Sequence, residues 1–135
     1  MNQTDLQALG EREGLGKTLG IEIIEATPER VVARMAITPQ IHQPLGFLHG
    51  GASVALAETA ASIGGWLHCP PGMAAFGQEI NANHVRPKRE GTLTAVAHPL
   101  HIGRSTHIWQ IEITDEQEKL VCVSRCTLAV IAVER

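Results

Sequence analysis

Apolar residues dominate the middle of the chain, where the segment from Ala52 to about Trp66 is apolar nearly all round a helical projection. This segment contains only good or tolerable helix formers until the pair Gly64-Gly65. A surface helix would carry a broad polar face, and this segment does not. The pattern therefore predicts a long helix that is buried on most of its sides.

Runs rich in β-branched and other apolar residues lie on both sides of this helix in the sequence. Residues 21–25 and 31–37, separated by a turn at 27–29, are typical of an antiparallel pair of strands. Four more strands are expected after the helix, at residues 74–84, 92–98, 107–113 and 120–133. The chain is therefore expected to build most of its structure from a sheet.

The N-terminal residues predict a short helix that precedes the strands. It is expected to run from Asp5 to about Glu13, with Thr4 as its N-cap. Gly14 and Gly16 are expected to end it. The predicted order is then one helix, two strands, the long buried helix and four strands.

This order predicts the α+β class, with one long buried central helix wrapped by a mostly antiparallel sheet. No repeat or linker divides the sequence, so a single domain is expected over residues 1–135. A sheet of this size covers only one side of so apolar a helix. The other side needs a further surface, and a second copy of the chain is its expected supplier.

Charge and cysteine content narrow the function classes. The net charge is −3 and the pI near 6.1, which gives no electrostatic reason to expect nucleic acid. No apolar run is long enough to cross a bilayer, and the first residues lack the charged and apolar regions of a secretory signal. Three cysteines with no close CxxC pair suggest a reducing compartment, so a cytoplasmic protein is expected.

Glu58 is the first candidate for chemistry, because it lies on the long apolar helix. Its neighbours one turn away are small or apolar, and no Lys or Arg occurs between residues 34 and 86. A carboxylate is costly to bury without a partner, so its presence favours a general base or nucleophile. The alternative is a glutamate that points to solvent at one exposed position of the helix.

Gly50 and Gly51 precede the helix, where backbone N–H groups have no intrahelical partner and favour negative charge. Glycine also allows a ligand to approach the backbone closely. The pair is therefore a candidate oxyanion site for the carbonyl of a thioester. Taken alone, such a pair is more often an ordinary glycine-marked turn into a helix.

The spacing of these two candidates has a structural consequence. Gly50 and Glu58 are eight residues apart, which is about 12 Å along a helix. An attacking group must lie about 3–3.5 Å from the carbonyl carbon, so one helix does not readily supply both groups to one substrate. Two antiparallel copies of the helix across a two-fold axis would, with Gly50 from one chain and Glu58 from the other.

Three further polar residues flank these groups. Gln43 and His49 lie in the loop before the helix, where they are candidates to bind or position the thioester. Ser62 follows Glu58 by one turn and could hydrogen-bond its carboxylate or the attacking water. The structural alternatives are a capping role for His49 and back-bonding to the preceding turn for Ser62.

Basic residues after the helix are candidates for binding the phosphates of coenzyme A. These residues are His84, Arg86, Lys88, Arg89 and Arg104. Each of them could equally be a solvated residue at the end of a strand. The seven histidines show neither HxxxH nor HExxH spacing, and no glycine-rich phosphate loop or GxSxG motif is present. We therefore expect neither a metal site nor a cofactor.

The stretch from Gln43 to Glu58, QPLGFLHGGASVALAE, resembles the signature of hotdog-fold thioesterases of the 4-hydroxybenzoyl-CoA thioesterase type, with a glutamate on the central helix. Residues 79–86, 99–104 and 109–113 resemble the subgroup that contains 1,4-dihydroxy-2-naphthoyl-CoA hydrolases and enterobactin-pathway proofreading thioesterases. The likeness covers nearly the whole chain after residue 15.

The resemblance implies a homodimer, usually paired into a tetramer, and the catalytic groups carry over position by position. It implies Glu58 as nucleophile or general base and Gly50 as backbone oxyanion donor. Gln43 and His49 would then bind the thioester region, and Ser62 would assist Glu58 or water. The basic residues from His84 onward would lie near the path of coenzyme A.

The sequence therefore favours a thioesterase that hydrolyses an aromatic or related acyl-CoA. Three alternatives stay open: a thioesterase for carrier-protein thioesters, a hotdog dehydratase that uses His49, and a non-catalytic acyl-thioester-binding module. The dehydratase lacks an aspartate near that histidine, since Asp5 and Asp115 are the only two. The sequence leaves the acyl group, the direct or water-mediated role of Glu58 and the tetramer arrangement open.

Overall fold

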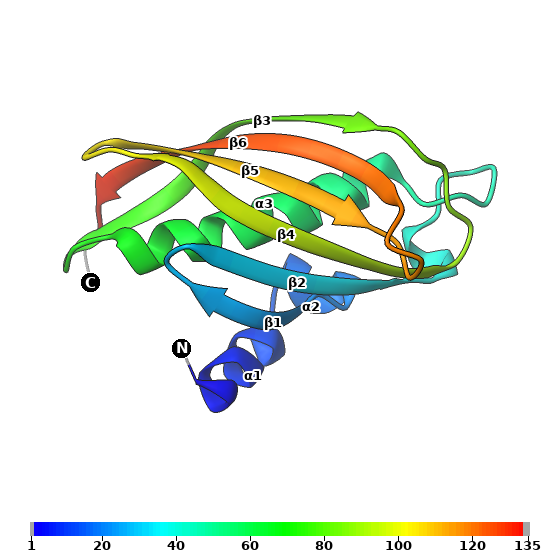
Figure 1. Ribbon diagram of the computed structural model, residues 1–135. Helices are drawn as coiled ribbons and strands as arrows, with labels where there is room; N and C mark the ends of the chain where they lie inside the picture. The colour runs from blue at the N-terminus through cyan, green and yellow to red at the C-terminus, as the bar shows by residue number, and fades with distance from the viewer. Residues whose placement is uncertain (1, 134–135) are drawn as a thin grey trace.

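The computed structural model describes residues 2–133, in which one long helix lies along one face of a curved antiparallel sheet (Figure 1). The elements, in chain order, are α1 (Gln3–Glu11), α2 (Leu15–Leu19), β1 (Glu22–Thr27), β2 (Arg30–Ile37), the 3₁₀ turn η1 (Pro39–Ile41), α3 (Gly50–His68), β3 (Met73–His84), β4 (Gly91–Ile102), β5 (Thr106–Thr114) and β6 (Leu120–Ala132). The predicted α+β class is confirmed, and α3 is the predicted buried helix.

The six strands form one sheet in the order β1-β2-β4-β5-β6-β3, and every neighbouring pair is antiparallel. The two strands expected before the helix pair as β1 and β2, and the four expected after it are all present. The sheet therefore ends in β3, a 12-residue strand that pairs only with β6 within the described chain. Its outer edge is free for another strand.

Strand β4 is longer than predicted, because it continues through Pro99. Proline has no N–H to donate, and it is tolerated in a sheet at edges and bulges. The pairing of β4 with β5 shifts register between Pro99 and His101, so the bulge accommodates the proline. The strand consequently reaches Ile102 instead of ending at His98.

The prediction for the N-terminus is wrong in detail. The side chain of Asn2, not Thr4, caps α1: it accepts the N–H of Asp5 at 2.9 Å, and Asp5 accepts the N–H of Asn2 in return. The helix ends at Glu11. Gly14 lies between the two helices as the N-cap of the short helix α2, whereas Gly16, expected as a terminator, lies inside α2.

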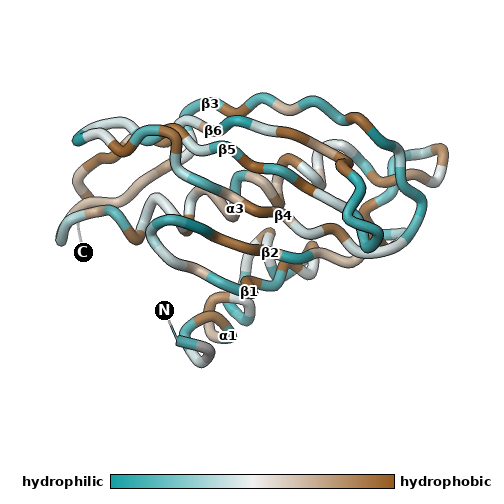
Figure 2. Tube along the Cα trace, in the orientation of Figure 1, coloured by the Kyte–Doolittle hydropathy of each residue, from teal (hydrophilic) through white to brown (hydrophobic). Residues whose placement is uncertain are grey.

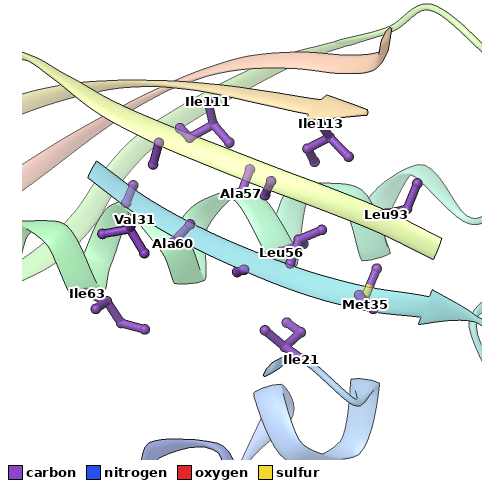
Figure 3. Close-up of a cluster of buried hydrophobic side chains, with 14 of the residues drawn as sticks. Ile21, Val31, Met35, Leu56, Ala57, Ala60, Ile63, Leu93, Ile111 and Ile113 are labelled. Atoms are coloured by element: carbon purple, nitrogen blue, oxygen red, sulfur yellow. The ribbon is translucent and has the colours of Figure 1, made fainter. Parts of the chain in front are cut away.

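Helix α3 presents two different faces. Its fully buried face packs against the inner side of the sheet, where Leu56, Ala57 and Ala60 lie against strands β2, β4 and β5 (Figure 3). The strands alternate between apolar and polar positions, while α3 is apolar along most of its length (Figure 2). In the described part of the chain, no helix is long and apolar enough to cross a membrane.

Two glycines allow α3 to approach the sheet closely. A Cβ at Gly64 would lie 2.3 Å from the ring of Trp109, and one at Gly65 would lie 2.4 Å from Leu128. Both distances are far below van der Waals contact. Each glycine costs about 1 kcal/mol of helix propensity relative to alanine, and here the close approach requires it.

His107 is a buried titratable group at the end of the sheet near the C-terminus of α3. It is 2% exposed, its Nδ1 has no hydrogen-bond partner, and its ring packs edge-on against His68 at 5.8 Å between centroids. Burial first, and then the nearby histidines His68 and His101, lower the pKa of His107. The imidazole is therefore held neutral in the folded chain.

We expect the protein to lose stability in mild acid because of this residue. The unfolded chain protonates His107 at about pH 6.5, whereas the folded chain keeps it neutral to lower pH. The unfolded state then binds more protons below pH 6.5, so the free energy of unfolding falls by up to about 1.4 kcal/mol per pH unit for this group. Urea unfolding at pH 7.5 and 5.5 measures the slope.

The variant His107→Gln should reduce that loss, while His98→Gln, which changes a histidine on the exposed surface, should keep it. An unchanged pH slope in His107→Gln would show that other groups cause the acid sensitivity. His68 and His101 are the groups to replace next in that case, because they face the same ring.

Candidate active site

The start of α3 presents backbone donors beside a capping histidine. Gly50 is the first helical residue, and the Nδ1 atom of His49 accepts the N–H of Gly51 at 2.7 Å. Because Nδ1 is the acceptor, the proton of a neutral imidazole lies on Nε2. His49 is therefore both the N-cap of the helix and an exposed donor next to Gly50.

Gln43 closes the loop that leads into the helix. Its Oε1 accepts the N–H of Leu45 at 2.6 Å and that of Phe47 at 3.3 Å. Both are donors, so the carbonyl end of the amide is fixed and the Nε2 donors are left for another partner. Gln43 lies in the same cavity wall as Gly50.

A cavity of about 350 Å³ opens at this end of α3, and we call it the helix-start pocket. Five predicted site residues line it: Gln43, Gly50, His84, Arg86 and Lys88. The imidazole of His84 lies directly over the first helical residue, since a Cβ added at Gly50 would be 2.8 Å from Nε2. The structure thus brings together groups separated by more than forty positions in the sequence.

Sequence reasoning missed Ser53 in this pocket. Its side chain is 1% exposed and its Oγ has no hydrogen-bond partner, which is unusual for a buried hydroxyl. The signal was a serine in the first turn of an otherwise apolar helix. That signal is weak, because serine is common near helix starts for capping reasons alone.

Glu58 lines a second, larger cavity of about 550 Å³, which we call the helix groove. The groove lies between one side of α3 and the segment from Leu9 to Lys17, and Ile21 and Ile23 at the start of the sheet also line it. Ser62, one turn further along, lines it too. Both side chains are half-buried, and the walls are mainly apolar. The groove has the size and character of a small-molecule site.

A glycine in β3 makes room for the Glu58 carboxylate. A Cβ at Gly77 would lie 2.9 Å from both Cδ and Oε2 of Glu58, so any larger residue would displace the carboxylate. The pairing of β3 with β6 shifts register between Gly77 and Glu79, at the same level. None of the ion pairs among the described residues involves Glu58.

Gly50 and Glu58 therefore open into different cavities of one protomer, as their separation along α3 requires. His49, Gln43 and His84 belong with Gly50, whereas Ser62 belongs with Glu58. Neither cavity is lined by both Gly50 and Glu58.

The basic residues after β3 differ in how far they are already engaged. The Nζ of Lys88 lies 3.3 Å from Asp115 and 3.0 Å from Glu116, and these hydrogen bonds, led by that to Glu116, hold its pKa above the ordinary value. The guanidinium of Arg89 lies 4.0 Å above the ring of Phe47. The Arg86 guanidinium donates from Nε to the backbone carbonyl of Leu120 at 3.4 Å, and no carboxylate within residues 2–133 pairs with it.

Arg104 lies apart from this cluster. It sits in the hairpin between β4 and β5, whereas residues 84–90 lie at the opposite end of β4. A strand of 12 residues spans about 40 Å, so the two regions are at opposite ends of the sheet (Figure 1). Within residues 2–133, no three His, Cys, Asp or Glu side chains are arranged to hold a metal ion.

Comparison with known proteins defines the class. The arrangement of one helix and one antiparallel sheet is shared with the crystal structure of a Haemophilus influenzae thioesterase, at a TM-score of 0.91 and 43% identity over 100% of this chain and 94% of that one. A 1,4-dihydroxy-2-naphthoyl-CoA hydrolase from Listeria monocytogenes is 53% identical over 87% of this chain and 95% of its own length.

Two crystal structures of a Staphylococcus aureus thioesterase are also similar, each at 39% identity, with TM-scores of 0.84 and 0.82. They cover 87% and 84% of this chain and 98% and 95% of theirs. One carries alanine in place of a glutamate and the other alanine in place of a glutamine. The two replaced residues are separated by the same number of positions as Gln43 and Glu58 here.

These similarities define a hotdog-fold thioester hydrolase. Residues 45–122 match the Thioesterase superfamily, and the chain belongs to that family. The family predicted from the segment between Gln43 and Glu58 is confirmed. The functional class, an enzyme that hydrolyses thioesters, follows from the same relatives.

Proposed function

We propose that this enzyme hydrolyses an acyl-CoA to the free acid and coenzyme A, at a site shared by two copies of the chain. Water adds to the thioester carbonyl, the bond from the carbonyl carbon to sulfur breaks, and the thiolate leaves and takes up a proton. The observation that carries the proposal is Glu58, a carboxylate without an ionic partner among the described residues, in a largely apolar groove.

Glu58 is assigned the role of general base or nucleophile. As a base, it takes the proton of the attacking water. As a nucleophile, it forms a mixed anhydride that water then hydrolyses. Ser62 lies one turn away in the same groove and is assigned to hydrogen-bond the carboxylate or the water. The Staphylococcus aureus thioesterase supports this role of Glu58, because a glutamate with the same spacing from a glutamine was replaced by alanine in it.

Gly50 is assigned as the oxyanion donor. Its N–H belongs to the unsatisfied first turn of α3, where the helix dipole favours negative charge. Gln43 keeps its Nε2 donors, and His49 keeps Nε2–H, so both can bind the thioester carbonyl or its surroundings. The glutamine replaced in the same relative supports a role for Gln43.

The sharing of the site between two chains rests on geometry. Gly50 and Glu58 line different cavities, and the α3 stripe with Glu58 is not covered by the sheet. The free edge of β3 runs beside Gly77 and the Glu58 carboxylate. A two-fold dimer through this region brings Gly50 of one chain to Glu58 of the other. Pairing of such dimers into a tetramer is part of the proposal.

Coenzyme A is assigned to the helix-start pocket. Arg86 and His84 line it, and Arg89 lies beside it over Phe47, so their charges suit the nucleotide phosphates. Lys88 is the weaker candidate, because two carboxylates already bind its ammonium. Arg104 contacts the nucleotide only if another copy of the chain brings it there.

An aromatic acyl group is proposed because the Listeria monocytogenes relative is named for a naphthoyl thioester. A cytoplasmic location is proposed as well, since coenzyme A thioesters are intracellular substrates and the three cysteines are free thiols.

The test is thiol release from a panel of aromatic and aliphatic acyl-CoAs, followed with a thiol-reactive dye. We expect turnover of aromatic acyl-CoAs in the usual range of about 1–10³ s⁻¹. The same acyl groups on a carrier protein should be cleaved more slowly. Faster thiol release from the carrier protein would show that the substrate is a carrier-protein thioester. Binding of acyl-CoA without thiol release would favour a non-catalytic acyl-thioester-binding module.

A further inference from the structure

Trp66 closes one end of the helix groove. The residues of α3 that line the groove recur at helical spacing along one stripe: Gly51, Val54, Ala55, Glu58, Thr59, Ser62, Ile63 and Trp66. Glu58 is in the middle of this stripe and Trp66 is its last member. The backbones of Glu58 and Trp66 are eight residues, or about 12 Å, apart along the helix. An acyl group whose carbonyl is held at Glu58 and which extends along the stripe reaches this ring.

The indole is held in one orientation although half of it is exposed. Its exposed fraction is 48%, and its Nε1–H donates to the carbonyl of Ala75 in β3 at 2.8 Å. The hydrogen bond ties the polar edge of the ring to the sheet. Trp66 lines a second hollow as well as the helix groove, and the other residues of that hollow are Cys69, Pro70, Pro71, Met73 and Ala74.

The hydrogen bond to Ala75 fixes this exposed indole in advance of binding. The groove wall is mainly apolar and includes Ile63, three residues before Trp66, while Ser62, one turn before the indole, is polar. A fixed ring in an apolar wall suits a flat π system, because aromatic rings gain from stacked or edge-on contact beyond the area they bury. A saturated ring of the same size gains only the burial.

We infer that Trp66 is a specificity-determining residue, which presents its ring to a planar aromatic acyl group held between itself and Glu58. This inference rests on the proposed function and deepens it. The ring contributes about three- to tenfold to the preference for an aromatic over a saturated acyl group, from the strength of aromatic pairs. The variant Trp66→Leu loses this factor, whereas Trp66→Phe retains most of it.

The experiment compares kcat/KM for biphenyl-4-carbonyl-CoA and 4-cyclohexylbenzoyl-CoA. Their outer rings lie far enough from the carbonyl to approach the indole, and they differ in π electrons but hardly in size. The ratio of the two values is measured in wild type, Trp66→Leu and Trp66→Phe. Dividing each variant's ratio by that of wild type removes the different intrinsic reactivity of the two thioesters. Phe76→Leu is the matched control, because Phe76 is also 48% exposed but does not line the groove.

We expect the ratio to fall three- to tenfold in Trp66→Leu and to change less than twofold in Trp66→Phe and Phe76→Leu. Inhibition by free coenzyme A should be unchanged in all three. Equal ratios in Trp66→Leu and wild type overturn the inference, and so does an equal loss in the leucine and phenylalanine variants, which indicates packing alone. No thiol release in wild type from either substrate counts against the proposed function instead.

Discussion

Glu58→Gln is expected to lower kcat for acyl-CoA hydrolysis by at least about 10²–10⁴-fold, the usual contribution of a general base. The amide has the shape of the carboxylate but neither takes a proton from water nor attacks a carbonyl. The groove is expected to tolerate it, because Gly77 has no side chain to crowd the group and the volume hardly changes. Thiol release from benzoyl-CoA measures the loss, and thermal unfolding checks that the fold is retained.

Glu79→Gln is the matched control. Glu79 is an exposed glutamate on β3, close in sequence to Gly77, and its carboxylate accepts a hydrogen bond from the Asn81 amide. It should keep activity within about twofold of wild type, as expected for a surface change. If Glu58→Gln kept wild-type kcat, the proposed chemistry would be wrong, since no other described carboxylate lines the groove except Glu13 at its rim.

Inactive Glu58→Gln chains are expected to regain activity when they are assembled with inactive Gly50→Val chains. A Cβ at Gly50 already meets His84 at 2.8 Å, so valine displaces the imidazole and covers the first backbone donor of α3. The loss should match that of an oxyanion donor, about 10²–10³-fold. In a mixed dimer, one site takes its glycine and its glutamate from the two unaltered halves.

Co-expression with two different affinity tags isolates the mixed assemblies. They should recover roughly half of wild-type kcat, because a two-fold dimer has two equivalent sites and one of them is intact. Each variant alone stays inactive. Mixed assemblies as inactive as their parents would show that Gly50 and Glu58 act within one chain, which would require α3 to bend or the substrate to reach across both cavities.

The sequence was sufficient to predict the elements whose pattern is repetitive. The apolar run after Gly51 predicted α3, and alternation predicted the strands. The sequence did not predict the N-cap of α1, because Asn2 and Thr4 are both good capping residues. Only the reciprocal hydrogen bonds between Asn2 and Asp5 decide between them. Likewise, Gly16 carries no sign that it belongs inside α2.

The candidate site was predictable along α3 but not across the sheet. The separation of Gly50 from Glu58 follows from helix geometry alone. The basic cluster is different, because sequence proximity treats Lys88 as a neighbour of Arg86 with the same role. In the fold, Lys88 pairs with Asp115 and Glu116, which lie in the turn between β5 and β6. Arg104 lies at the far end of β4. Such pairings arise from topology, which no local pattern encodes.

The contact between Gly64 and Trp109 limits how this sequence can change over time. The indole occupies the space that any side chain at position 64 would need. A substitution at either position is therefore constrained by the other: an alanine at 64 is tolerated only after the ring at 109 has been replaced by a smaller residue. In an alignment of homologues, the two columns should covary, and substitution of Gly64 beside a retained Trp109 should be nearly absent.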